Sequence, residues 1–322
     1  MSKWWLRIAG GIALVALAIW FLNTSVFELV PDSQQPRLLA HRGVHQIYVG
    51  DDRTADTCRA NPVAASNHGL IENTIPSMQA AVAAGADVVE LDVHLTTDGI
   101  LAVFHDWTLE CLTDGTGVTH QQDFAYLQSL DLGYGYTSDG ETFALRGTAG
   151  PMPSLRDVLT ADLGGQLLIN FKSNKAEDAA ALDALLRDLP DTTAQVFGAY
   201  GGAEPTQAIL AARADMRGFD RTTLRSCLIR YAAMGWSGYM PHACRNTLVA
   251  VPLDYAPYLW GWPHRFTRRM QAAGSDVILW GPYDGSGFSS GIDDAATLAQ
   301  VPDHFDGYIW TNRAELIGPL MQ

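Results

Sequence analysis

Short apolar segments with strand character alternate with helical segments along most of the chain, and this alternation constrains the fold more than any other feature. Strands that alternate with helices favour a parallel sheet with helices packed outside it. About eight such units predict a (β/α)8 barrel, and 322 residues are enough for one. The expected strands are 37–43, 88–96, 100–106, 166–172, 194–200, 217–220, 238–242, 276–281 and 306–312.

The first 23 residues are different in kind. Lys3 and Arg7 precede an apolar run from Ile8 to Leu22, and this pattern predicts a transmembrane signal anchor over residues 1–23. A cleaved signal peptide is the alternative, but no Ala-x-Ala site follows the run, so we favour the uncleaved anchor. Positive residues before the run predict a single-pass, membrane-anchored protein whose main domain is exported to the periplasmic or extracellular side.

Residues 24–36 are expected to be a linker, and residues 37–322 the barrel.

Composition narrows the class of partner. The chain holds 35 acidic against 21 basic residues, a net charge of −14. Nucleic-acid binding needs a basic surface, so nucleic acid is excluded as the expected partner.

The four cysteines fit an exported chain. Cys58, Cys111, Cys227 and Cys244 allow three pairings, among which sequence cannot choose. We favour two local bridges, Cys58–Cys111 and Cys227–Cys244. Free buried thiols are the alternative.

Two carboxylates interrupt the apolar strand 88–96. Side chains alternate faces along a strand, so Glu90, Asp92 and His94 share one side, and two residues rise about 6.6 Å. Two buried carboxylates repel each other and lose hydration, so a cation is expected between them. A divalent metal is one solution. A solvated edge strand, or ion pairs with Arg or Lys, are the alternatives.

Several other expected strands also end in polar residues. In a (β/α)8 barrel the carboxyl ends of all strands open at one mouth, where catalytic groups sit. The set offers two histidines for proton transfer, carboxylates for a hard cation, and Arg and Lys for an anion. Such a set suits cleavage of a phosphodiester. Its main members are His41, Arg42, Glu90, Asp92, His105, Asp106, Asn170, Lys172, Trp280, Thr311 and Asn312.

The residues that carry these groups resemble the glycerophosphodiester phosphodiesterase family. The resemblance starts at "HRG" and continues through "ENTIPSMQAAVAAGADVVELDVHLTTDGILAVFHDWTLECLTDGTG", "MPSLRDVL", "LLINFK" and "FDGYIWTNRAELI". It extends over residues 37–318, and the block from Glu72 to Gly117 is its most specific part.

The resemblance implies a TIM barrel that hydrolyses glycerophosphodiesters to glycerol 3-phosphate and an alcohol, with Mg²⁺ or Ca²⁺ at the mouth. It implies that a neighbouring glycerol hydroxyl attacks the phosphate, and that water then opens the cyclic phosphate. The roles it implies are an acid–base pair of His41 and His105, phosphate binding by Arg42 and Lys172, and metal binding by Glu72, Glu90, Asp92 and Asn170.

Two features depart from the family pattern. The family reads Glu-x-Lys where this chain reads Asn170-Phe171-Lys172, and an amide brings no charge to a metal. Residues 44–71 form an insertion between "HRG" and "EN", which is expected at the barrel mouth. A cap that shapes substrate access and a passive surface loop are both open for it.

Three functions from two classes follow. The first is a membrane-anchored, metal-dependent phosphodiesterase acting on a glycerophosphodiester or a lysophospholipid, the latter giving a phosphatidic-type product. The second is a phospholipase D-like or lyase activity that stops at a cyclic phosphate. The third is a catalytically impaired barrel that serves as a binding module of the cell envelope, for which Asn170 is the sequence support.

Overall fold

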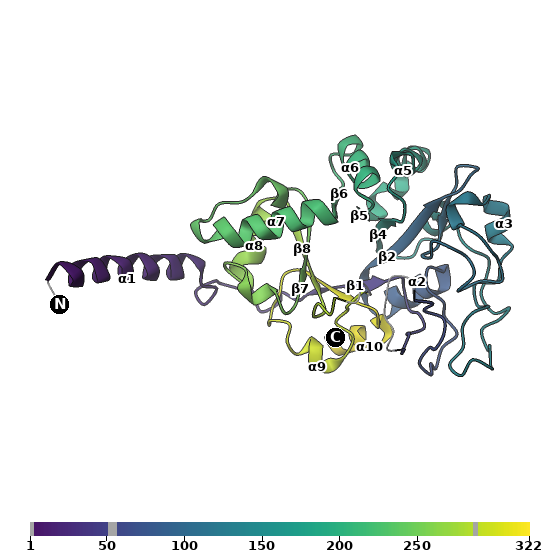
Figure 1. Ribbon diagram of the computed structural model, residues 1–322, viewed down its shortest axis with the longest axis horizontal. Coiled ribbons are helices and arrows are strands. Elements are labelled where there is room, and N and C mark those ends of the chain that lie inside the picture. The colour runs from purple at the N-terminus through teal and green to yellow at the C-terminus, as the bar shows by residue number, and fades with distance from the viewer. Residues whose placement is uncertain (1–2, 51–56, 286–288) are drawn as a thin grey trace.

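Eight parallel strands form one curved sheet in the computed structural model, which describes residues 3–50, 57–285 and 289–322 (Figure 1). Their order in the sheet is β6-β5-β4-β2-β1-β9-β8-β7. A short ninth strand, β3 (Leu101–Val103), pairs antiparallel with β2. The eight are β1 (Arg37–His41), β2 (Ala86–Leu95), β4 (Gln166–Phe171), β5 (Val196–Gly201), β6 (Arg217–Asp220), β7 (Leu248–Pro252), β8 (Asp276–Trp280) and β9 (Tyr308–Thr311).

The two ends of this sheet approach each other at β6 and β7. The hydroxyl of Thr247, just before β7, donates to the carbonyl of Gly218 in β6 at 2.6 Å. The strand order and this contact give the (β/α)8 barrel that the alternation of strands and helices predicts.

Helices surround the sheet on its outer side (Figure 1). Thr74 caps α2 by accepting from the amide of Ser77, and Ser154 caps α4 in a capping box with Asp157. The α-helices are α1 (Lys3–Asn23), α2 (Ile75–Ala83), α3 (Phe124–Gln128), α4 (Leu155–Thr160), α5 (Ala176–Asp188), α6 (Ala203–Ala212), α7 (Arg221–Met234), α8 (His264–Ala272), α9 (Ala295–Leu298) and α10 (Ala314–Met321). Short 3-10 helices are η1 (Thr119–Gln121), η2 (Pro190–Gln195), η3 (Gly235–Ser237), η4 (His242–Cys244) and η5 (Ala256–Tyr258).

The core has three parts. The largest lies between the sheet and the outer helices, and a second fills the barrel with side chains such as Leu39, Val88 and Trp310. A third joins the insertion 44–71 to the segment that follows β3, through Ala60, Val63 and Leu112 among others. The insertion therefore has an apolar core of its own rather than lying loosely on the surface.

The prediction of a strand over residues 238–242 is wrong. Gly238 takes a positive φ of 80°, and Pro241 offers no amide to a strand ladder; η4 follows at once. The strand is β7, a continuous apolar run buried on both faces, as parallel strands in a barrel are.

Both favoured disulfides are confirmed. Cys58 in the insertion joins Cys111, and Cys227 in α7 joins Cys244 in η4. The alternative of free thiols is wrong for these four residues.

The prediction of a transmembrane helix over residues 1–23 lacks support. Helix α1 extends away from the barrel (Figure 1). Among the helices in the described ranges, none combines the length and hydropathy that a membrane crossing requires. The apolar run from Ile8 to Leu22 is short of the roughly 20 residues that span a bilayer, and Arg7 stands directly before it.

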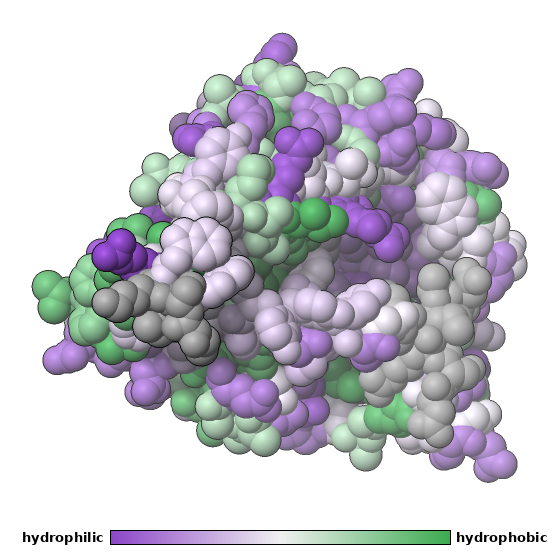
Figure 2. Space-filling view, turned by 60° about the vertical axis from the view of Figure 1, so that its left-hand side comes forward, coloured by the Kyte–Doolittle hydropathy of each residue, from purple (hydrophilic) through white to green (hydrophobic). Residues whose placement is uncertain are grey.

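The segment after α1 contacts the barrel instead of hanging free. Asn23 donates to the carbonyl of Trp236, and Glu28 forms an ion pair with Arg265 in α8. The surface seen in Figure 2 mixes hydrophilic and hydrophobic residues and is hollowed near its centre.

Candidate active site

The register of the central strands brings the predicted polar residues together. His41 at the end of β1 stands opposite Glu90 in β2, and Asp92 stands opposite Asn170 in β4. Parallel strands end at the same edge, so one mouth collects these side chains. His105 lies two residues after β3, and its carbonyl is 3.3 Å from Nε2 of His94 in β2.

The "HRG" motif makes the turn that exposes this edge. Arg42 and Gly43 both take positive φ, 59° and 79°. A Cβ on Gly43 would lie within 3 Å of the backbone of Ser77, so the position requires glycine. The amide of Arg42 donates to the carbonyl of Glu90 at 2.9 Å, and this bond fixes the side chain of Arg42 over β2.

Asp92 is fully buried and surrounded by donors. Amide nitrogens of Asn170 and Asn73 lie 2.8 and 3.0 Å from its two oxygens. Nε of Arg42 is 3.2 Å away and Nζ of Lys172 is 3.5 Å away. Asp92 therefore forms ion pairs with Arg42 and Lys172, which is one of the alternatives that the sequence left open for this strand.

Glu90 is equally buried but poorly compensated. The hydroxyl of Tyr200 in β5 donates to its Oε1 at 2.7 Å, while Oε2 has no hydrogen-bond partner and lies 3.7 Å from Nε2 of His41. Burial, followed by repulsion from Asp92, raises the pKa of Glu90 well above its ordinary value.

His41 is held in one orientation. Its Nδ1 is 2.6 Å from Oδ1 of Asn312, which follows β9. Asn312 donates its own amide to Asp293 at 2.7 Å, so its oxygen faces the histidine and Nδ1 carries the proton. Burial, followed by the neighbouring His45, lowers the pKa of His41 well below its ordinary value. The ring is therefore neutral near pH 7, with the lone pair on Nε2.

His105 sits in a charged cluster. Its Nδ1 lies 2.7 Å from Oδ1 of Asp106 and 2.8 Å from Nη2 of Arg59. Burial, followed by the positive charges of Arg59 and Lys172, lowers the pKa of His105 well below its ordinary value. Both predicted acid–base residues are therefore neutral histidines, and His41 is close enough to His105 to contribute to the lowering of its pKa.

Glu72 does not face the other carboxylates as a metal ligand would. Its two oxygens each lie 3.1 Å from a different guanidinium nitrogen of Arg59, and Nη1 of Arg42 is 3.4 Å away. Arginine thus supplies the charge that balances Glu72.

The predicted metal set of Glu72, Glu90, Asp92 and Asn170 stays a prediction. Across the described part of the chain, no three His, Cys, Asp or Glu side chains are grouped to hold a metal ion. Asn170 turns its amide nitrogen, not its oxygen, to Asp92. The pair Glu90 and Asp92 still fits a cation, because Oε2 of Glu90 is a buried acceptor without a partner.

Sequence reasoning missed several residues that complete this mouth. Asn73 adjoins the predicted Glu72, so its position carried a signal, whereas Asp106 and Asn312 were already among the residues predicted at the mouth. Arg59 carried none, because it lies in an insertion without a recognisable pattern. Tyr200 ends an expected strand but looks like core.

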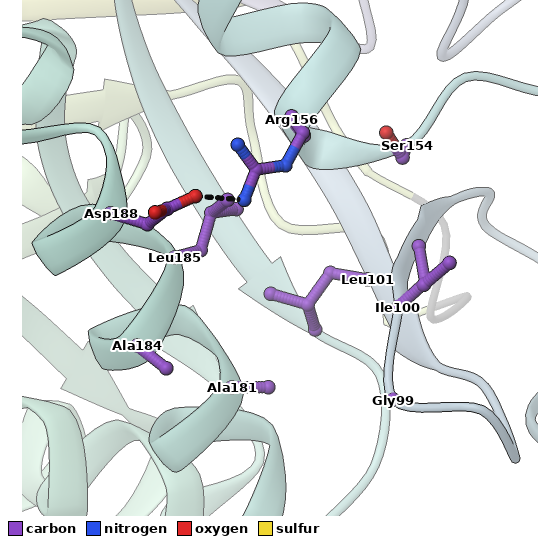
Figure 3. Close-up of a pocket in the computed structure, with 9 residues that line it drawn as sticks. All are labelled: Gly99, Ile100, Leu101, Ser154, Arg156, Ala181, Ala184, Leu185 and Asp188. Carbon is purple, nitrogen blue, oxygen red and sulfur yellow. Dashed lines mark hydrogen bonds and ion pairs between the residues drawn. The ribbon is translucent and has the colours of Figure 1, made fainter.

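A pocket on the barrel flank is separate from this mouth. It lies between α4, α5 and the turn before β3, and apolar side chains such as Leu101 and Leu185 line it (Figure 3). Its charged groups, Arg156 and Asp188, pair with each other. It therefore offers no free charge for a phosphate.

The fold and the mouth define a TIM barrel with two neutral histidines and with the cationic side chains of Arg42 and Lys172 beside Asp92. Residues 41–195 match the glycerophosphoryl diester phosphodiesterase family, so this part of the chain is similar to that family. The solved glycerophosphoryl diester phosphodiesterase domain of an uncharacterized Mycobacterium tuberculosis protein is similar in fold, with a TM-score of 0.62 and 18% identity over 89% of this chain and 100% of that one.

Two further relatives agree. A glycerophosphodiester phosphodiesterase of Caldanaerobacter subterraneus is 42% identical over 101 residues, which is 31% of this chain and 39% of the relative. An Oleispira antarctica phosphodiesterase, solved with the product sn-glycerol-3-phosphate, has a TM-score of 0.56 and 18% identity over 89% of this chain and 98% of that one. The aligned segment covers 39% of the Caldanaerobacter relative and 30% of the Mycobacterium tuberculosis protein, so the chain matches less than two fifths of the length of either one.

Proposed function

We propose that this chain is a phosphoric diester hydrolase that cleaves glycerophosphodiesters to glycerol 3-phosphate and an alcohol. The observation that carries the proposal is the pair of neutral histidines at one mouth, His41 and His105. Beside them, Arg42 and Lys172 pair with the buried Asp92. The family match over residues 41–195 supports the same reaction.

His41 is the base of the first step. Asn312 keeps its proton on Nδ1, so Nε2 can accept a proton from the attacking hydroxyl. His105 protonates the leaving alcohol once the anionic phosphate between the two rings has raised its proton affinity. In the second step the roles exchange, and water opens the cyclic phosphate.

Arg42 and Lys172 bind the phosphate. Both contact Asp92 without substrate, at 3.2 and 3.5 Å, and both can donate to a phosphate oxygen as well. Asp92 lies between the two side chains and holds them at fixed positions at the mouth. Their positive charges are therefore already in place when the phosphate binds.

A divalent cation, Mg²⁺ or Ca²⁺, is part of the proposal through the family. Glu90 and Asp92 would hold it, and it would neutralise charge that develops on the phosphate. Glu72 is not assigned to it, since Arg59 and Arg42 occupy its oxygens.

The deciding experiment identifies products. The protein is incubated with glycerophosphocholine, glycerophosphoethanolamine, glycerophosphoglycerol and lysophosphatidylcholine, with Mg²⁺, Ca²⁺ or chelator. Glycerol 3-phosphate from the first three substrates is the expected result. A cyclic phosphate as the end product means the lyase alternative, and lysophospholipid cleavage means the wider substrate range. Binding without turnover means the envelope binding module.

We also propose that the barrel works outside the cytoplasm. Two disulfides support this, because such bonds persist in oxidising compartments. Alkaline phosphatase fused after Gln322 is expected to be active, because it folds only after export. Activity of a cytoplasm-only reporter at that position would contradict the proposal.

A further inference from the structure

Arg59 reaches from the insertion into the mouth and joins three site residues. Its guanidinium forms a fork on the carboxylate of Glu72 and lies 2.8 Å from Nδ1 of His105. The same nitrogen, Nη2, also contacts Oδ1 of Asp106. One side chain thus links the start of α2 to the residues after β3.

The insertion holds Arg59 from both sides. Cys58, directly before it, is bonded to Cys111 in the segment after β3. Ala60, directly after it, is fully buried, and its carbonyl accepts from the amide of Thr137 at 2.9 Å. The backbone at Arg59 is therefore tied to the segment after β3, and the disulfide is one of two ties.

Arg59 and Asp106 compete for the same atom of His105. Arginine can only donate a hydrogen bond, whereas an ionised carboxylate can only accept one. Nδ1 of His105 can therefore accept from Arg59, which leaves the proton on Nε2, or donate to Asp106, which leaves the lone pair on Nε2. As a cation, His105 donates Nδ1–H to Asp106 and can give up the proton on Nε2; once neutral, it keeps Nδ1–H on Asp106 and offers the lone pair of Nε2. Arg59 opposes the cation and favours the other neutral tautomer, so its contact sets both the proton affinity and the tautomer of the ring.

We propose that Arg59 is a positioning residue for His105, and that the Cys58–Cys111 disulfide is needed to keep it there. This inference rests on the proposed function for its activity readout, but its structural readout does not. The other charged or titratable groups that face His105 are Asp106, Lys172, His41 and His94. Arg59 is the one that the insertion supplies.

The first test compares Arg59→Ala with Arg59→Lys. The alanine variant is expected to lower kcat about tenfold or more while KM changes less, because substrate contacts stay in place. The alkaline limb of the kcat/KM profile, which reports loss of the proton from His105 as the acid, is expected to move to higher pH, because a positive charge beside His105 is lost. Arg59→Lys keeps the positive charge but not the planar guanidinium. It is therefore expected to return the limb to its wild-type pH more fully than it returns kcat to the wild-type value.

The second test asks whether the disulfide acts through Arg59. Cys58→Ser/Cys111→Ser is expected to lower kcat like Arg59→Ala, and to add little when combined with it, because coupled changes are not additive. Cys227→Ser/Cys244→Ser is the matched control. It removes a disulfide of the other half of the barrel, and it should lower thermal stability but leave kcat and the pH profile unchanged at a temperature where it stays folded.

The third test needs no substrate. Imidazole NMR titration of His105 in the wild type and in Arg59→Ala should show its proton affinity rising about tenfold or more in the variant, one pKa unit. An unchanged titration overturns the proposal, as does full additivity of the disulfide and Arg59 variants. If the wild type turns over none of the substrates, the proposed function fails, and the titration still decides the role of Arg59.

Discussion

The two halves of the barrel contribute different kinds of side chain to the site. The half from β1 to β4 supplies His41, His105 and the two buried carboxylates of β2, the groups that we propose carry out the chemistry. The half from β5 to β9 supplies neutral partners: Tyr200 donates to Glu90, and Asn312 accepts from His41. Charge is concentrated in one half, and the other half sets the orientation and protonation of what the first half presents.

The largest effect is expected from the histidines of the first half. His41→Ala or His105→Ala should lower kcat by about 10² or more, because a general acid or base contributes roughly that much. His242→Ala, an exposed histidine of the second half, is the control and should keep wild-type turnover. Steady-state kinetics on the best glycerophosphodiester would measure it. Near-full activity of His41→Ala would show that the pair is assigned wrongly.

A smaller loss is expected from the orienting partner in the second half. Asn312→Ala removes the acceptor that holds the proton of His41 on Nδ1, and kcat should fall on the order of tenfold. Asn312→Asp keeps an acceptor and adds a negative charge, so the activity loss should be smaller and the acidic limb of kcat/KM should rise in pH. Equal losses in both variants would mean that orientation of the ring is not what Asn312 provides.

Asn170→Glu tests how charge is balanced within the first half. The amide of Asn170 donates to Asp92 in the native chain, and a carboxylate cannot. Without metal the variant should be about 1–3 kcal/mol less stable. It should bind Mg²⁺ or Ca²⁺ about tenfold more tightly, roughly 1.4 kcal/mol, and stay active. Calorimetric titration of both proteins measures the affinity, and identical values would show that residue 170 does not face the cation.

The smallest effect concerns His94, which is buried behind the site. Burial lowers its pKa to about 4, so its neutral form stabilises the fold fully above pH 6.5, and that contribution is lost as the pH falls toward 4. The wild type should therefore lose stability in urea unfolding over this range faster than His94→Gln, by at most about 1.4 kcal/mol per pH unit. Parallel curves for the two proteins would contradict the shift.

The sequence predicted those parts of the site that strand ends dictate. His41, Glu90, Asp92 and Asn170 follow from a side-chain period of two and a common edge of parallel strands. Arg59 could not be predicted in this way, because its place depends on a disulfide and a core that form only in three dimensions. The same arginine pairs with Glu72, whose metal-binding role stays a prediction.

The strand at 238–242 failed for a local reason, since aromatic and apolar letters outweighed Gly238 and Pro241. The run Leu248–Pro252 lies only a few residues later and satisfies the alternation equally well. The alternation of strand and helix patterns predicts how many strand–helix units the barrel has. It cannot decide which of two neighbouring apolar segments forms a given strand.

The position of β1 between β2 and β9 affects when the site can form during synthesis of the chain. β1 lies far ahead of its second neighbour in the sequence, and the partner of His41 follows it by 271 residues. Contacts over such a sequence distance form late and slowly. Until Asn312 has left the ribosome, a nascent chain holds an incomplete barrel in which His41 lacks its orienting partner, and the proposed hydrolysis would begin only afterwards.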